Sequence, residues 1–143
     1  MYNKILIIVF AAASFHAQAS WKVTENSDPM TDVKSKIAIS SNGLIGGGCE
    51  RFLFGFNKYM NQDGEMAFVT IRVDKEDATF AVGEWFNNYA VITTLSLKER
   101  GIYDQMISGH KIIFQSENYK GYKETVTDDL LGFTKAMKLT GCK

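Results

Sequence analysis

Residues 44–56, LIGGGCERFLFGF, place three glycines directly before one of the two cysteines of the chain. Three kinds of chemistry use these residue types: a phosphate-binding loop, a reactive thiolate, and a structural disulfide. A Walker loop needs Lys-Ser/Thr after its last glycine, and a dinucleotide loop needs G-x-G-x-x-G between a strand and a helix. Gly46-Gly47-Gly48 is followed instead by Cys49-Glu50-Arg51 and then by a strand pattern. The glycines are therefore expected to form a turn or bulge that brings Cys49 to a partner.

Residues 1–19 have the pattern of a secretory signal peptide. Lys4 gives a positive start, residues 5–13 (ILIIVFAAA) are an apolar run too short to cross a bilayer, and Ala17-Gln18-Ala19 is a small-x-small cleavage site. Cleavage before Ser20 would leave residues 20–143 as one domain without a membrane anchor. An uncleaved anchor is the alternative, but the run is short and is followed by no basic stop residues.

An exported chain folds under oxidising conditions, so its two cysteines are expected to form one disulfide, Cys49 with Cys142. This bond would close the loop from residue 49 to residue 142, and for such a loop the chain-entropy model gives a stabilisation on the order of 4 to 5 kcal/mol. A catalytic thiol would need a neighbouring histidine, and His110 is the only histidine beyond the leader.

The charges exclude some classes of partner. Lys and Arg together number 16, as do Asp and Glu, so the net charge is formally zero. A nucleic-acid-binding or anionic-membrane-binding domain would carry a basic excess. We therefore expect neither partner.

Alternating apolar residues predict an antiparallel meander, with β-branched and aromatic residues in most runs. The expected strands are residues 35–41, 52–56, 66–73, 78–85, 89–97, 110–115 and 119–126. Helical spacing appears at 97–107, with Gly109 as a stop, and at 131–139, with Thr127, Asp128 or Asp129 as the N-cap. The predicted fold is mainly β, an antiparallel β-sandwich or barrel-like domain with one or two short helices and one disulfide.

The remaining polar clusters favour structure over catalysis. His110 has no Cys, His or carboxylate partner at a metal-binding spacing and is expected at an exposed strand end. Asp74, Glu76 and Asp77 do not follow a calcium-loop pattern, and neither do Asp128 and Asp129, so turn and helix-cap roles are expected for both clusters. We predict no catalytic residue, no metal site and no cofactor.

One loop could bind a partner. Residues 118–123, NYKGYK, interleave Tyr119 and Tyr122 with Lys120 and Lys123 around a glycine turn. Tyrosines on a loop tip bury much area at low entropy cost, so these four residues are the candidate partner-binding site. The alternative is an ordinary hairpin with cross-strand tyrosines.

The spacing of several residues resembles that of small exported bacterial proteins related to the type VI secretion accessory VasI and, more distantly, to the invasion-associated locus B family. The residues that carry the resemblance are Trp21, Asp28-Pro29-Met30 with Asp32, Cys49 before an aromatic strand, residues 69–74 (VTIRVD), Trp85, and Gly132-Phe133 in a terminal helix that runs to Cys142. The resemblance implies a noncatalytic, β-rich envelope domain with one long-range disulfide.

These observations favour a periplasmic, nonenzymatic protein that binds an envelope or secretion-system protein. Two alternatives within binding functions are an inhibitor or immunity protein against a cell-wall hydrolase, and an exclusion factor of a phage or mobile element. An enzyme acting on cell wall or glycan is a third class, which would need two carboxylates facing each other across a cleft.

Overall fold

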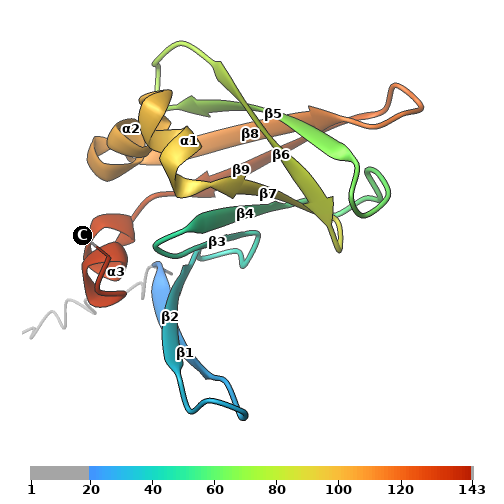
Figure 1. The fold of residues 1–143 in the computed structure, drawn as a ribbon. Coiled ribbons are helices and arrows are strands. Elements are labelled where there is room, and N and C mark those ends of the chain that lie inside the picture. The colour runs from blue at the N-terminus through green and yellow to red at the C-terminus, as the bar shows by residue number, and fades with distance from the viewer. Residues whose placement is uncertain (1–19, 143) are drawn as a thin grey trace, which may run out of the picture.

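The computed structural model describes residues 20–142, and its strands form one antiparallel sheet (Figure 1). The strands are β1 (Lys22–Ser27), β2 (Lys34–Ile39), β3 (Ile45–Gly47), β4 (Arg51–Gly55), β5 (Met66–Val73), β6 (Thr79–Phe86), β7 (Tyr89–Thr93), β8 (Lys111–Glu117) and β9 (Lys123–Asp129). The helices are α1 (Thr94–Glu99), α2 (Ile102–Ser108) and α3 (Phe133–Leu139). The order across the sheet is β1-β2-β3-β4-β7-β6-β5-β8-β9. The mainly antiparallel β fold is confirmed.

Alternation along the strands separates a core face from an outer face. β5 alternates exposed and buried residues over its whole length, as the period of a strand requires. The inward side chains of the central strands pack with the helices into an aromatic core, in which Phe54 and Phe114 make an edge contact at 5.3 Å. The ring centres of Phe52 on β4 and Phe133 on α3 lie 6.1 Å apart, so α3 packs against the sheet at this point.

The sheet curls until its β9 edge meets the loops of the other half, which makes the fold barrel-like. No strand of the described range 20–142 pairs with the free edge of β9 to close this seam. Instead the Glu124 carboxylate on β9 accepts hydrogen bonds from the backbone N–H groups of Asn57 and Lys58, both at 3.0 Å. The Ser41 hydroxyl donates to Asp129 Oδ2 at 2.8 Å. The Glu124 carboxylate thus satisfies two backbone N–H groups that a neighbouring strand would otherwise pair, and the Ser41–Asp129 bond holds the seam beside it.

Three short helices are described where one or two were expected. The helical spacing predicted at residues 97–107 divides at Gly101, whose φ of 73° is left-handed and separates α1 from α2. The predicted N-cap of the last helix was wrong. Asp128 and Asp129 continue β9 in register with β8, and α3 begins after Gly132 (φ 81°) without a side-chain cap.

The sequence patterns did not predict β1, which pairs with β2 over residues 22–39. The outer half of this hairpin projects from the body (Figure 1), and most of its residues are exposed. Its base is anchored by Trp21, whose backbone N–H donates to Leu131 O at 3.0 Å and whose indole N–H donates to Asp129 O at 2.9 Å. The Trp21 ring lies edge-on to Phe133 at 4.8 Å.

None of the helices within residues 20–142 is long and apolar enough to cross a membrane. The predicted signal peptide, residues 1–19, lies outside the described residues.

Candidate functional site

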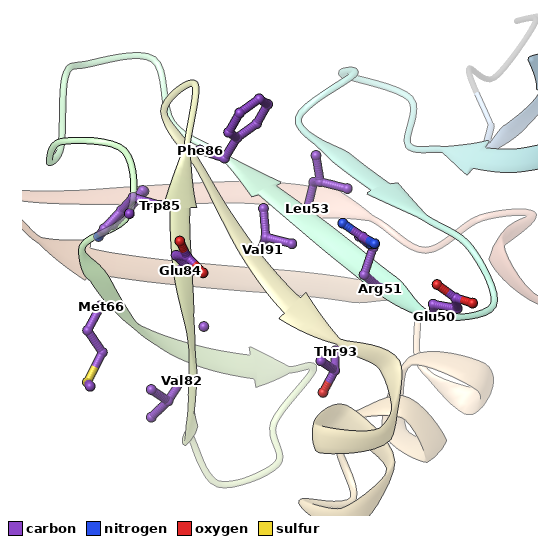
Figure 2. Close-up of a pocket in the computed structure, with 12 residues that line it drawn as sticks. Glu50, Arg51, Leu53, Met66, Val82, Glu84, Trp85, Phe86, Val91 and Thr93 are labelled. Atoms are coloured by element: carbon purple, nitrogen blue, oxygen red, sulfur yellow. The ribbon is translucent and has the colours of Figure 1, made fainter. Parts of the chain in front are cut away.

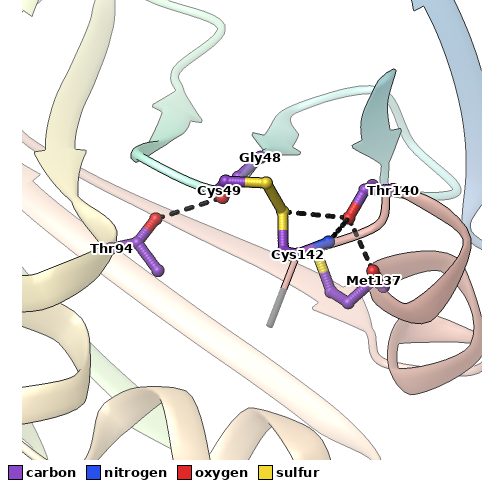
Figure 3. Close-up of a disulfide and its surroundings, with 6 residues drawn as sticks. All are labelled: Gly48, Cys49, Thr94, Met137, Thr140 and Cys142. Atoms are coloured by element: carbon purple, nitrogen blue, oxygen red, sulfur yellow. Dashed lines mark hydrogen bonds between the residues drawn. A yellow bond between two sulfur atoms is a disulfide. The ribbon is translucent and has the colours of Figure 1, made fainter. Parts of the chain in front are cut away.

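The two cysteines form the predicted disulfide, Cys49–Cys142, with their Cα atoms 5.1 Å apart (Figure 3). The Thr94 hydroxyl donates to Gly48 O at 3.1 Å beside Cys49, and the Thr140 hydroxyl, which donates to Met137 O, lies 3.1 Å from Cys142 Sγ. Both sulfurs are therefore committed to structure. No free thiol therefore remains that could act as a catalytic nucleophile.

The glycines before Cys49 do more than form a turn. Gly46 and Gly47 belong to β3, and the turn lies at residues 48–50, where Gly48 N–H donates to Arg51 O at 3.0 Å. A Cβ on Gly47 would stand 2.0 Å from a ring carbon of Phe52, so the ring occupies the space that any larger residue needs. Glycine is required at residue 47 because an aromatic core side chain packs directly on the backbone.

The predicted partner-binding loop lies between β8 and β9. Tyr119 is 67% exposed and Tyr122 is 40% exposed. The ammonium of Lys120 lies 5.4 Å from the centre of the Tyr119 ring, and Lys123 pairs with Glu117 at 3.6 Å. These side chains face solvent, but nothing in the geometry shows that they bind a partner, and that role stays a prediction.

Tyr122 also connects the β8–β9 loop to the β4–β5 loop through Lys58. The Lys58 ammonium donates a hydrogen bond to the Tyr122 hydroxyl and lies 4.7 Å from the centre of the ring. This hydrogen bond is the main cause that raises the pKa of Lys58 above its ordinary value.

The charged turn after β5 has a structural role. Asp74 adopts a positive φ of 50°, and its carboxylate accepts hydrogen bonds from the backbone N–H groups of Lys111, at 2.9 Å, and His110. The hydrogen bond from Lys111 is the largest cause that holds the pKa of Asp74 below its ordinary value. His110 is an exposed residue just before β8, with Nδ1 3.7 Å from the Asp74 carboxylate. Among residues 20–142, no three His, Cys, Asp or Glu side chains gather as a metal site.

The outer face of the central strands carries an apolar surface that the sequence analysis missed. Met66 and Phe68 of β5 are 62% and 56% exposed, and Phe80 and Phe86 of β6 are 54% and 56% exposed. Cross-strand pairing places Phe68 opposite Val82. We call the four exposed residues and Val82 the outer apolar face. An exposed apolar cluster of this kind on a sheet typically marks an interaction site.

A groove of about 820 Å³ crosses this face from β4 to β5 (Figure 2). Its lining is apolar for the most part, with a few charged side chains, and includes Arg51, Leu53, Val82, Glu84, Phe86 and Val91. Apolar groups flanked by a few charges are suited to recognition of another molecule.

Comparison with protein-family models, with curated proteins and with solved structures found no match for this chain. The resemblance to the VasI and invasion-associated locus B families stays a hypothesis.

The outer apolar face had a sequence pattern that could have revealed it. A strand with one solvated face alternates apolar and polar residues. Residues 66–69 (MAFV) and 80–82 (FAV) are instead apolar at inward and outward positions alike.

Proposed function

We propose that this chain is an exported, noncatalytic protein of the periplasm that acts by binding another envelope protein, as an accessory of a secretion apparatus. The observation that carries the proposal is the outer apolar face. Four large apolar side chains on two adjacent strands are each more than half exposed. The Cys49–Cys142 disulfide and the leader pattern of residues 1–19 support export.

The outer apolar face is a stronger candidate than the tyrosine loop. Burying the exposed half of a large apolar side chain contributes on the order of 1 kcal/mol, and these side chains sit on rigid strands. Tyr119 and Tyr122 are only two side chains on a turn, and Tyr122 is 40% exposed because its ring already contacts Lys58. We therefore place the main contact on β5 and β6 and keep the loop as a second contact.

Site-specific photocrosslinking in the producing cell tests this function. A photoreactive phenylalanine at residue 80 should capture one discrete envelope protein. The same residue at Leu95, which is 64% exposed on α1, is the matched control and should capture nothing specific. Equal capture at both positions, or capture at neither, would contradict the proposal.

Cell fractionation and intact mass answer the question of compartment. The mature protein should be released with the periplasmic fraction and should begin at Ser20. A protein that retains residues 1–19 would contradict export through a cleaved leader.

The projecting β1–β2 hairpin favours the second candidate, an inhibitor or immunity protein against a cell-wall hydrolase. Met30 at its tip is 89% exposed, and Val33 beside it is 62% exposed. A narrow hairpin with an apolar tip is suited to filling an enzyme cleft. Shortening the tip by removing residues 29–32 should then abolish inhibition of a cell-wall hydrolase, whereas Phe80→Ser should leave inhibition intact.

A further inference from the structure

The sheet splits next to the groove. β6 has eight residues, but its pairing with β7 covers only Glu84, Trp85 and Phe86. The chain then leaves β7 after Thr93 and enters α1, so within residues 20–142 no strand pairs with residues 79–83 of β6 on that side. Figure 2 shows β6 and β7 diverging from their paired end, and the groove is lined from both sides of this opening.

Gly83 lies where the two strands separate. A Cβ on Gly83 would stand 2.0 Å from the Val91 carbonyl oxygen and 2.9 Å from Ile92 Cγ1. Because residue 83 has no side chain, the backbones of β6 and β7 can come into contact at this point before the two strands diverge.

The direction of the backbone groups on β6 follows from the hydrogen bonds of Trp85. Its N–H donates to Glu65 O and its C=O accepts from Gly64 N–H, both at 2.9 Å, so the groups of Trp85 point toward β5. Groups of alternate residues point to opposite edges of a strand. The N–H and C=O of Val82 therefore point into the opening between β6 and β7.

The carbonyl of Phe80 on the same edge shows how such a group is satisfied elsewhere. Arg100 Nη1 donates to Phe80 O at 2.9 Å, and the guanidinium lies 4.9 Å from the centre of the Phe80 ring. No backbone pairing described for residues 20–142 provides Val82 with a corresponding partner on this edge.

The charges of the groove also limit which molecule can bind in it. Arg51 of β4 lines the groove opposite β6, and its guanidinium takes part in none of the ion pairs among residues 20–142. A guanidinium presents a planar fork of donors that matches a carboxylate. Glu50 and Glu84 line the same groove, so the segment that binds should bring a carboxylate to Arg51 and keep it away from these two glutamates.

We propose that the groove takes an extended segment of a partner protein, which adds as a short strand to the free edge of β6 at Val82 and places a carboxylate on Arg51. The inference rests on the proposed binding function and specifies how the partner is held. Strand addition provides backbone hydrogen bonds to Val82, and alternate side chains of the segment contact Leu53 and Val91 on the groove floor.

The test uses a displayed library of random octapeptides with free C-termini, selected against the purified, disulfide-bonded chain. Enriched peptides should alternate apolar residues and carry a carboxylate at a fixed position or at the C-terminus. The best synthetic peptide should lose at least tenfold in affinity for the Arg51→Gln variant. Arg72→Gln on β5, which removes an exposed arginine outside the groove, is the matched control and should change affinity less than twofold.

Amide hydrogen exchange follows the backbone contact directly. The Val82 amide should exchange rapidly in the free chain and become protected when the octapeptide saturates the site. Methylating the peptide nitrogen that faces Val82 O should weaken binding at least tenfold, and this readout does not depend on a protein variant that folds.

Four results would overturn the proposal. They are a library without binders, binders indifferent to Arg51→Gln, a Val82 amide equally exchangeable with and without peptide, and protection of Val82 that rises with protein concentration alone. The last result would assign the face to a second copy of the chain. If residue 80 still captures an envelope protein while Val82 stays unprotected, the binding function stands and the strand-addition mode falls.

Discussion

Removing the disulfide should destabilise the protein through the unfolded state more than through the folded one. The bond closes a loop with a sequence separation of 93 residues. For such a loop the chain-entropy model gives about 4.6 kcal/mol at 25 °C. In the double variant Cys49→Ser, Cys142→Ser the folded chain keeps α3 docked, because Phe133, Ala136 and Met137 remain buried. We therefore expect a loss of roughly 4 to 5 kcal/mol in the free energy of unfolding, or a fall of roughly 10–20 °C in the thermal midpoint.

Urea unfolding monitored by tryptophan fluorescence measures this loss, because Trp21 and Trp85 are both buried in the folded chain. The urea dependence of the free energy should steepen as the unfolded chain expands. Reduced wild-type protein is the control and should unfold like the double variant. A loss below about 1 kcal/mol with an unchanged slope would refute the entropic argument.

Three further perturbations test local features. Gly47→Ala should cost about 1–3 kcal/mol in urea unfolding because its Cβ would meet an aromatic ring at 2.0 Å, whereas Gly48→Ala, whose nearest neighbour lies at 3.8 Å, should cost less than about 0.5 kcal/mol. Asp74→Asn should lower the thermal midpoint at neutral pH but not in strong acid. The folded-state pKa of Asp74 lies below its ordinary value of 3.8, so the contribution is complete above that value and is lost as pH falls through the folded pKa. Tyr119→Ala with Tyr122→Ala should weaken partner capture and leave the calorimetric midpoint nearly unchanged, because both side chains lie at the surface and the Lys58–Tyr122 hydrogen bond is exposed to solvent; a large fall would show that the rings stabilise the fold.

Much of the fold was predictable from two features: the alternation of apolar and polar residues along the strands, and the presence of only two cysteines. The pattern of residues 66–73 coincides with β5, since every second side chain there enters the core. The pairing of Cys49 with Cys142, which the structure shows, was predicted from the expected export and from the count of cysteines.

The elements that were missed depend on contacts distant in sequence. β1 (KVTENS) is mostly polar and forms by pairing with β2, while its base is anchored through Trp21 to residues near the C-terminus. β3 contains two glycines, which propensity alone would exclude from a strand, and pairing with β4 overrides that preference. The candidate groove escaped prediction for a related reason. Its free edge exists because β6 and β7 diverge at Gly83, which no local pattern encodes.

The anchoring of Trp21 also links folding to the direction of synthesis. The acceptors of its two N–H groups are the carbonyls of Asp129 and Leu131, and the partner of Cys49 is Cys142. A ribosome makes Asp129 and Leu131 long after Trp21, so a nascent chain that has not reached them lacks the groups that anchor the base of β1. The base of β1 can therefore be fixed only late, after the strands between Trp21 and Asp129 have been synthesised.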